Sequence, residues 1–138
     1  MKISFKTSRA SFDGILEDNP IAEALIQRLP FASTLQRWGD EIYFDIPVAA
    51  PNFLPTRQVA VGDIAYWPDG PCLCIFFGQT PASLAREPRP ASDVTVLGHT
   101  DAPPDLLRLI EGGQIIEVEK AERNQGPGTR RRNRPAGR

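Results

Sequence analysis

The residues of this chain that are best suited to chemistry are aromatic side chains placed beside charges and glycines. They fall in two stretches, residues 37–44 (RWGDEIYF) and residues 62–81 (GDIAYWPDGPCLCIFFGQTP). Together these stretches contain both tryptophans and both tyrosines of the chain. Large aromatic residues beside tight turns and charges fill a core, form the walls of a pocket, or do both. We therefore expect a binding site built from these two stretches.

Arg37 is the polar group best placed to anchor a ligand in this site. It lies two residues before a turn, so its planar guanidinium can emerge at a rim of the fold and hold a carboxylate or a peptide carbonyl. An ion pair with Glu41 across the hairpin is the alternative. Trp38 and Trp67 either pack in the core or form flat walls for a ligand. The residues expected to form the ligand pocket are Arg37, Trp38, Glu41, Tyr43, Trp67, Phe77, Gly78, Thr80 and Pro81.

The sequence does not supply a convincing catalytic or metal-binding group. Asp40 and Asp63 each lie beside a glycine in a turn, where a carboxylate usually accepts hydrogen bonds from backbone amides. His99 is the only histidine, and with two cysteines it does not make a zinc site. Cys72 and Cys74 share one face of a strand, so we expect small core or pocket-wall residues rather than a disulfide. We expect no catalytic residue, no metal and no cofactor.

The charge of the chain is divided between an acidic body and a basic end. Residues 1–121 contain ten Lys and Arg against 16 Asp and Glu, whereas residues 122–138 contain six Arg against one Glu. The end is also rich in Gly, Pro and Asn, so we expect one domain over residues 1–121 and a disordered Arg-rich tail over residues 122–138. We expect any weak contact with a polyanion to be made by this tail. The alternative is a solvated tail that aids solubility.

Neither a membrane segment nor a signal peptide is expected. The longest apolar run, residues 72–77, has the length of a strand and not of a membrane-spanning helix. The first ten residues alternate between polar and apolar side chains and lack the apolar stretch of a secretory signal. We expect a cytoplasmic protein that does not contact a membrane.

Short apolar or alternating segments between turn residues indicate about eight strands and two short helices. One helix of about ten residues starts at Asn19-Pro20 and ends at Pro30, and the other covers residues 105–111. The expected strands are residues 2–7 (an edge strand), 11–16, 31–38, 41–46, a short strand or extended lead-in at 58–61, 64–67, 72–77, 94–98 and 114–119. Residues 78–92 form a long connection of the kind that often carries function.

These elements indicate a mainly β fold. In a chain of this size they favour a closed eight-stranded β-barrel whose ends are capped by two short α-helices. A two-sheet sandwich is the alternative. In the barrel, the proline-rich loop at residues 47–55 would place Phe53 and Leu54 where they can cover an opening.

Three motifs of the chain resemble the cyclophilin-like family of small bacterial and archaeal proteins, long described as a domain of unknown function. They are RWGDEIYF at residues 37–44, VGDIAYWPDGPCLCIFFGQTP at residues 61–81 and VTVLG at residues 94–98. The resemblance covers roughly residues 1–121 and implies a cyclophilin-type barrel of eight strands closed by two helices. The basic tail departs from the family pattern.

The resemblance to true cyclophilins is one of fold. Those peptidyl-prolyl isomerases use an arginine in a Phe-His-Arg run, with Gln-Gly-Gly and Ser-Gln-Phe-Phe segments around a proline pocket. The first two runs are absent here, and residues 74–77 only faintly echo the third. Because fold alone does not transfer function, we expect a non-catalytic module that binds a small molecule or a proline-containing peptide. The alternative is a peptidyl-prolyl isomerase of low activity, with Arg37 as its cation.

Overall fold

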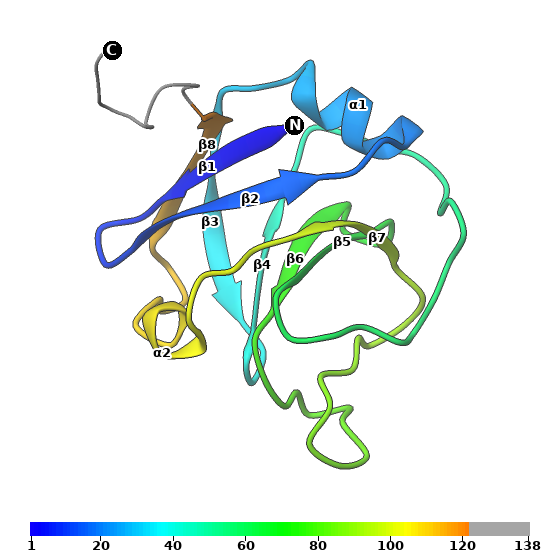
Figure 1. Ribbon diagram of the computed structural model, residues 1–138, viewed down its shortest axis with the longest axis vertical. Coiled ribbons are helices and arrows are strands. Elements are labelled where there is room, and N and C mark those ends of the chain that lie inside the picture. Colours follow the sequence, from blue (N-terminus) through cyan, green and yellow to red (C-terminus); the bar gives the residue numbers. More distant parts are fainter. Residues whose placement is uncertain (122–138) are drawn as a thin grey trace.

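The computed structural model describes residues 1–121, which form eight strands and two short helices (Figure 1). Residues 122–138, for which the sequence predicts a disordered tail, lie outside the described residues. The strands are β1 (Lys2–Lys6), β2 (Ser11–Leu16), β3 (Phe31–Arg37), β4 (Glu41–Asp45), β5 (Asp63–Trp67), β6 (Cys72–Phe76), β7 (Thr95–His99) and β8 (Ile115–Lys120). The helices are α1 (Pro20–Ile26) and α2 (Pro104–Leu107).

The strands close into one antiparallel barrel in the order β1-β2-β7-β5-β6-β4-β3-β8. The prediction of a mainly β fold with a closed eight-stranded barrel and two short helices is confirmed, and the alternative of a two-sheet sandwich is wrong. The prediction of an edge strand at residues 2–7 is also wrong, because β1 pairs with β2 on one side and with β8 on the other. Closure gives every strand two neighbours, so the barrel needs no protected edge.

Both helices begin where the sequence predicts and are shorter than predicted. Asn19 caps α1, and its side-chain oxygen accepts a hydrogen bond from the Ala22 amide at 2.8 Å. The second helix ends at Leu107, and the chain continues in turns in which the amides of Leu109 and Ile110 donate to the carbonyls of Leu106 and Leu107. The Ile110 carbonyl accepts a hydrogen bond from the guanidinium of Arg37 at 2.8 Å. The helices lie on opposite sides of the strands (Figure 1) and bury side chains in the core of the barrel.

Residues 58–61, for which the sequence predicts a short strand or an extended lead-in, do not form a strand. The amide of Ala60 donates a hydrogen bond to the carboxylate of Asp63 at 2.8 Å, which confirms that Asp63 serves the turn. Because a side chain satisfies this backbone group, the segment turns instead of pairing with a neighbouring strand. A single bridge between Thr56 and Val94 ties this loop to the segment that leads into β7.

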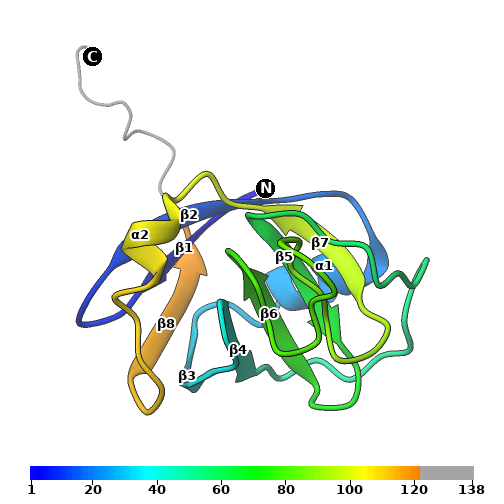
Figure 2. The same ribbon diagram turned by 90° about the horizontal axis from the view of Figure 1, so that it is seen from below.

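Side chains of β4, β5 and β6 point alternately into and out of the barrel. The inward ones join the main core, and the outward ones form a second apolar cluster from Tyr43, Ala65, Trp67, Cys72, Cys74 and Phe76, together with Val59 and Val94. β6 is buried along its whole length, because the interior covers one face and loops cover the other. These loops include residues 46–62 and 82–94, which lie on the side of the barrel away from α2 (Figures 1 and 2).

Candidate functional site

A cavity of about 190 Å³ lies on the outer face of the barrel, over β4 and β6 and under the loop that leads to β7. It therefore lies on the outside of the barrel wall, and not at a rim. Four of the predicted pocket residues meet there: Trp38, Glu41, Tyr43 and Trp67. The complete lining is Trp38, Glu41, Tyr43, Trp67, Cys74, Pro90, Ala91 and Val94.

Strand register brings these side chains to one face. Glu41 and Tyr43 are two residues apart on β4, so both point outward. Tyr43 lies directly opposite Cys74 on β6, and Cys74 lies opposite Ala65 on β5. Trp67 is two residues further along β5 and shares this face. The carboxylate of Glu41 and the ring of Tyr43 thus project from β4, and the ring of Trp67 projects from β5. The strand between them, β6, contributes the thiol of Cys74.

Glu41 is the unusual group of the cavity. Its side chain is buried, with 5% of the residue exposed, and its Oε1 has no hydrogen-bond partner among residues 1–121. Burial raises its pKa to about 7, and the thiol of Cys74 offsets part of that rise as a hydrogen-bond donor. No ion pair joins Glu41 to a Lys, Arg or His of the described chain. Protonated and ionised forms of Glu41 therefore coexist near neutral pH.

The two thiols beside the cavity are not activated. Burial is the main cause that raises the pKa of Cys72 to about 12, and the neighbouring Asp45 carboxylate adds to the rise. Burial and the Glu41 carboxylate raise the pKa of Cys74 well above its ordinary range. Both thiols stay protonated at neutral pH, and a protonated thiol is a poor nucleophile. Cys74 serves as a small wall residue of the cavity.

The aromatic walls are held in defined orientations. The rings of Tyr43 and Trp67 meet edge to face, with centroids 6.5 Å apart and planes at 81°. The indole N–H of Trp67 donates a hydrogen bond to the hydroxyl of Ser92 at 2.6 Å. The amide of Trp38 donates to the Glu41 carbonyl at 2.9 Å and closes the turn between β3 and β4. The walls are thus set by contacts within the protein itself.

The loop that forms the outer wall of the cavity is stabilised by hydrogen bonds between its own residues. The hydroxyl of Thr80 donates a hydrogen bond to the Arg89 carbonyl, just before the lining residue Pro90. The Ser83 hydroxyl accepts a hydrogen bond from the Thr80 amide at 2.9 Å. Thr80, a predicted pocket residue, therefore supports the wall without lining the cavity. Pro81, another, packs against the turn at Gly39.

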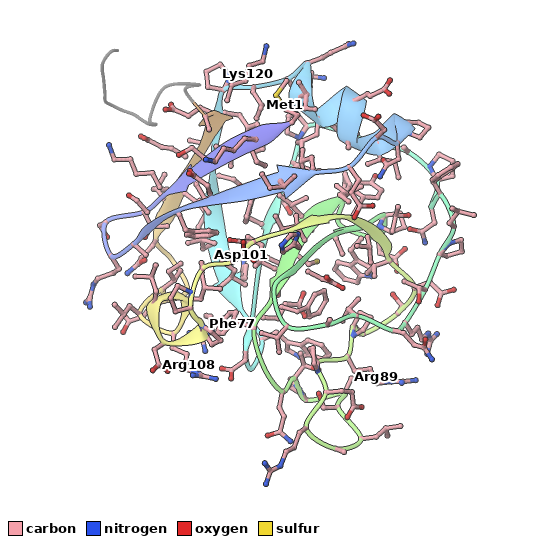
Figure 3. All side chains as sticks on the ribbon, in the orientation of Figure 1. Met1, Phe77, Arg89, Asp101, Arg108 and Lys120 are labelled. Carbon is pink, nitrogen blue, oxygen red and sulfur yellow. The ribbon has the colours of Figure 1, made fainter. Side chains whose placement is uncertain are left out.

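The remaining predicted residues, Arg37, Phe77 and Gly78, lie outside the cavity lining. The guanidinium of Arg37 is 5.2 Å from the ring centre of Phe77, which is buried in the main core. Gly78 packs against Asp40, and a Cβ there would lie 2.3 Å from the Asp40 carboxylate. Figure 3 shows Phe77 and Arg108 near α2, with Arg89 on the loop across the barrel. Arg37, Phe77 and Gly78 thus connect the β3–β4 turn to α2.

The predicted ion pair between Arg37 and Glu41 is not formed. Arg37 pairs with Asp40 at 3.3 Å, and it also donates hydrogen bonds to the carbonyls of Gly39 and Ile110. The reason is strand alternation. Arg37 lies opposite Ile42, and cross-strand partners share a face, whereas Glu41 points to the other side.

Three lining residues were not predicted: Pro90, Ala91 and Val94. Cys74 was expected to be a core or pocket-wall residue, but it was not assigned to this pocket. Pairing of β4 with β6 brings Cys74 beside Tyr43, and these strands are not consecutive in the chain. The loop residues reach the cavity only because the chain folds back over the outer face of the sheet. The prolines of residues 78–92 indicated a loop, but local sequence contains no signal for where that loop docks.

Within residues 1–121, no group of three or more His, Cys, Asp or Glu side chains is arranged to hold a metal ion. His99 belongs to no such group in this part of the chain. Its side chain is exposed and contacts Asp101 at 3.1 Å. In the same part of the chain, none of the helices has the length and apolar character needed to cross a membrane.

Comparisons with known proteins agree with this architecture. A family model described as cyclophilin-like matches residues 1–119. A solved structure that is similar to this chain is the solution structure of a hypothetical protein from Archaeoglobus fulgidus. The TM-score is 0.75 and the sequences are 36% identical, over 88% of this chain and 95% of that one. A comparison with curated proteins gives no match.

Proposed function

Because the chain belongs to the cyclophilin-like family, we propose that it is a binding module that holds a small ligand or short peptide in the outer-face cavity. In this proposal the protein performs no chemistry of its own. The observation that carries it is Glu41, a buried carboxylate whose Oε1 lacks a partner among the described residues and which borders an open cavity. A buried polar group without a partner is costly, and a ligand that supplies the partner removes that cost.

The size and walls of the cavity support this proposal. Ligand sites are concave, mostly apolar, and carry a few polar groups that fix orientation. Here aromatic and small apolar side chains surround one carboxylate. The volume of about 190 Å³ exceeds the roughly 150 Å³ of an engineered cavity that takes up benzene. A compact group or a single side chain of a peptide would fill it.

The chemical inventory of the cavity favours binding over catalysis. Its ionisable groups are Glu41, Tyr43 and Cys74. Burial is the main cause that raises the pKa of the Tyr43 phenol, and the Cys74 thiol is likewise held protonated. Glu41 then remains as the acid–base group of the described cavity lining. This lining supplies neither a nucleophile that Glu41 could activate nor a second acid.

In the alternative function, peptidyl-prolyl isomerisation, Arg37 would supply the catalytic cation. That guanidinium is bonded to Asp40 and to the Ile110 carbonyl, and it does not line the cavity. A protease-coupled assay with a prolyl peptide decides between the two functions. We expect no rate above the uncatalysed background at micromolar protein, and a rate that Glu41→Gln or Trp67→Ala removes would overturn the proposal.

The proposal is tested by NMR screening of the full chain with a fragment library that contains neutral, cationic and anionic compounds and prolyl dipeptides. We expect hits to shift the indole resonances of Trp38 and Trp67 and the amides of Glu41 and Cys74. Trp67→Ala should abolish these shifts. Phe53→Ala is the matched control, because Phe53 is a 44% exposed aromatic on a loop outside the cavity lining. Hits that map elsewhere, or a library without hits, would refute the proposal.

A further inference from the structure

We propose that the ligand of the outer-face cavity carries an alkylated ammonium group, held among the rings of Trp38, Tyr43 and Trp67 and beside the carboxylate of Glu41. This inference rests on the proposed function and adds to it the charge and shape of the bound group. It follows from the arrangement of the rings, the lack of a partner for the Glu41 carboxylate Oε1 among residues 1–121, and the scarcity of other polar groups in the lining.

The three rings form walls on several sides of one space. They come from the β3–β4 turn, from β4 and from β5, and all three line the cavity. The planes of Tyr43 and Trp67 stand at 81° to each other, so they form adjoining walls and not a parallel slot. Such walls suit a compact, rounded group. Aromatic faces carry partial negative charge, and cages of this kind attract organic cations within about 6 Å of a ring centre.

The carboxylate supplies the countercharge. Glu41 is buried, and its Oε1 has no hydrogen-bond partner in the described part of the chain. An unpaired carboxylate that is moved out of water loses its hydration, which is unfavourable unless a partner replaces the lost interactions. A bound cation offsets that cost, and the low polarity of the site strengthens the attraction.

The groups that face Glu41 do not provide a positive charge, so a ligand can supply the countercharge. On β4 its neighbour is the phenol of Tyr43, and on β6 it meets the thiol of Cys74. The lining from β5 and from the covering loop contributes no ionisable side chain. Asp93 on that loop is paired with Arg57 at 3.0 Å, at an exposed position. Within residues 1–121, therefore, no cation of the protein neutralises Glu41.

The lining favours an alkylated ammonium over a bare one. A bare ammonium has three N–H donors that all need acceptors. The indole N–H of Trp67 is a donor and is already bonded to Ser92, so it cannot accept. Few acceptors remain besides Glu41. Methyl groups on the nitrogen replace N–H donors by apolar surface, which packs against Trp38, Tyr43 and Pro90.

The test compares choline with its uncharged isostere 3,3-dimethylbutan-1-ol, titrated into the full chain at pH 8 and followed by calorimetry. We expect choline to bind at least about ten-fold more tightly, the preference that a charge-assisted interaction of about 1.4 kcal/mol provides. Choline affinity should fall at least several-fold at pH 5.5, where Glu41 is protonated, while that of the isostere should not. Glu41→Gln should remove the preference. The matched control is Asp45→Asn, which removes a carboxylate from β4 at a position four residues from Glu41 and outside the cavity lining.

The outcomes separate this inference from the function on which it rests. Equal binding of choline and the isostere, or cavity binding by neutral fragments alone, would overturn the ammonium inference and leave the binding module in place. A preference for choline that survives in Glu41→Gln would also overturn it, because the carboxylate would then not be the recognition group. If no compound of the library binds, the proposed function fails as well.

Discussion

Glu41 determines how stability should respond to pH. Its pKa is about 7 in the folded protein, against an ordinary value of 4.5 that the unfolded chain recovers. Between these values the folded state binds the proton more strongly, so Glu41 favours folding at low pH and the free energy of unfolding falls as pH rises through this window. The shift corresponds to at most about 3 kcal/mol at pH 8.

Glu41→Gln cannot titrate, so it should not show this loss. We expect the unfolding free energy of the variant, relative to the wild type, to increase by about 2–3 kcal/mol between pH 5 and pH 8. Urea denaturation at the two pH values measures it, with Asp45→Asn as the control. Parallel pH profiles for wild type and Glu41→Gln would show that the carboxyl is not perturbed.

Trp67→Ala should affect binding more than stability. Trp67 is only partly buried and packs on the outer cluster of the barrel, so we expect a loss of about 1–2 kcal/mol rather than the roughly 3–5 kcal/mol of a core aromatic. Binding of cavity ligands should disappear. Denaturant unfolding and ligand titration of the same samples measure the two effects. A loss above about 3 kcal/mol with binding retained would place Trp67 in the core and remove the aromatic wall from the account.

At the scale of elements, the β3–β4 turn connects the cavity to the loop that covers it. Gly39 has a φ of 62°, and a Cβ there would lie 2.8 Å from the Gln79 carbonyl oxygen and 2.9 Å from the Cα of Thr80. Its neighbour Trp38 lines the cavity. A side chain at Gly39 would therefore push the turn and the covering loop apart.

Gly39→Ala should destabilise the protein by about 2–3 kcal/mol and weaken ligand binding, because it combines a positive φ with a clash against backbone atoms. The control is Gly113→Ala, which has a φ of 91° and no atom within 4 Å of an added Cβ. That variant should cost only about 1 kcal/mol and leave binding unchanged. Equal effects of the two substitutions, measured by unfolding and titration, would mean that contact between turn and loop is unimportant.

The strands could be predicted from the sequence more completely than their pairing could. Alternation and turn residues locate all eight strands nearly to their ends, because these signals are local. Alternation also places Glu41 and Tyr43 on one face. The pairing of β4 with β6 and the docking of the loop at Pro90 depend on contacts between distant parts of the chain. The sequence therefore left open whether Cys74 lies in the core or in a pocket wall, and it did not predict Pro90 in the lining.

At the scale of the whole molecule, charge is unevenly distributed. Residues 1–121 carry an excess of acidic side chains, which favours the approach of a cationic ligand to the barrel. Residues 122–138 carry six Arg, and any contact with a polyanion should depend on them. The cavity is built entirely from residues 38–94. The two properties should therefore separate when the chain is cut.

Truncation after Ala121 should abolish retention on a nucleic-acid column at low salt and leave choline affinity unchanged. Retention that survives the truncation would exclude the arginine-rich end as the contact. Loss of choline binding in the truncated protein, with its unfolding free energy unchanged, would mean that the cavity is not the complete site.

We infer that the buried carboxylate of Glu41, whose Oε1 lacks a partner among residues 1–121, binds a cationic ligand. The most direct test is a carbon-13 NMR titration of the Glu41 carboxyl group, with and without saturating choline. We expect a pKa of about 7 in the free protein and a decrease of about one unit or more with choline, because the cation binds the ionised form. The uncharged isostere should cause no decrease. A pKa near 4.5 in the free protein, or a value that choline does not change, would contradict the account.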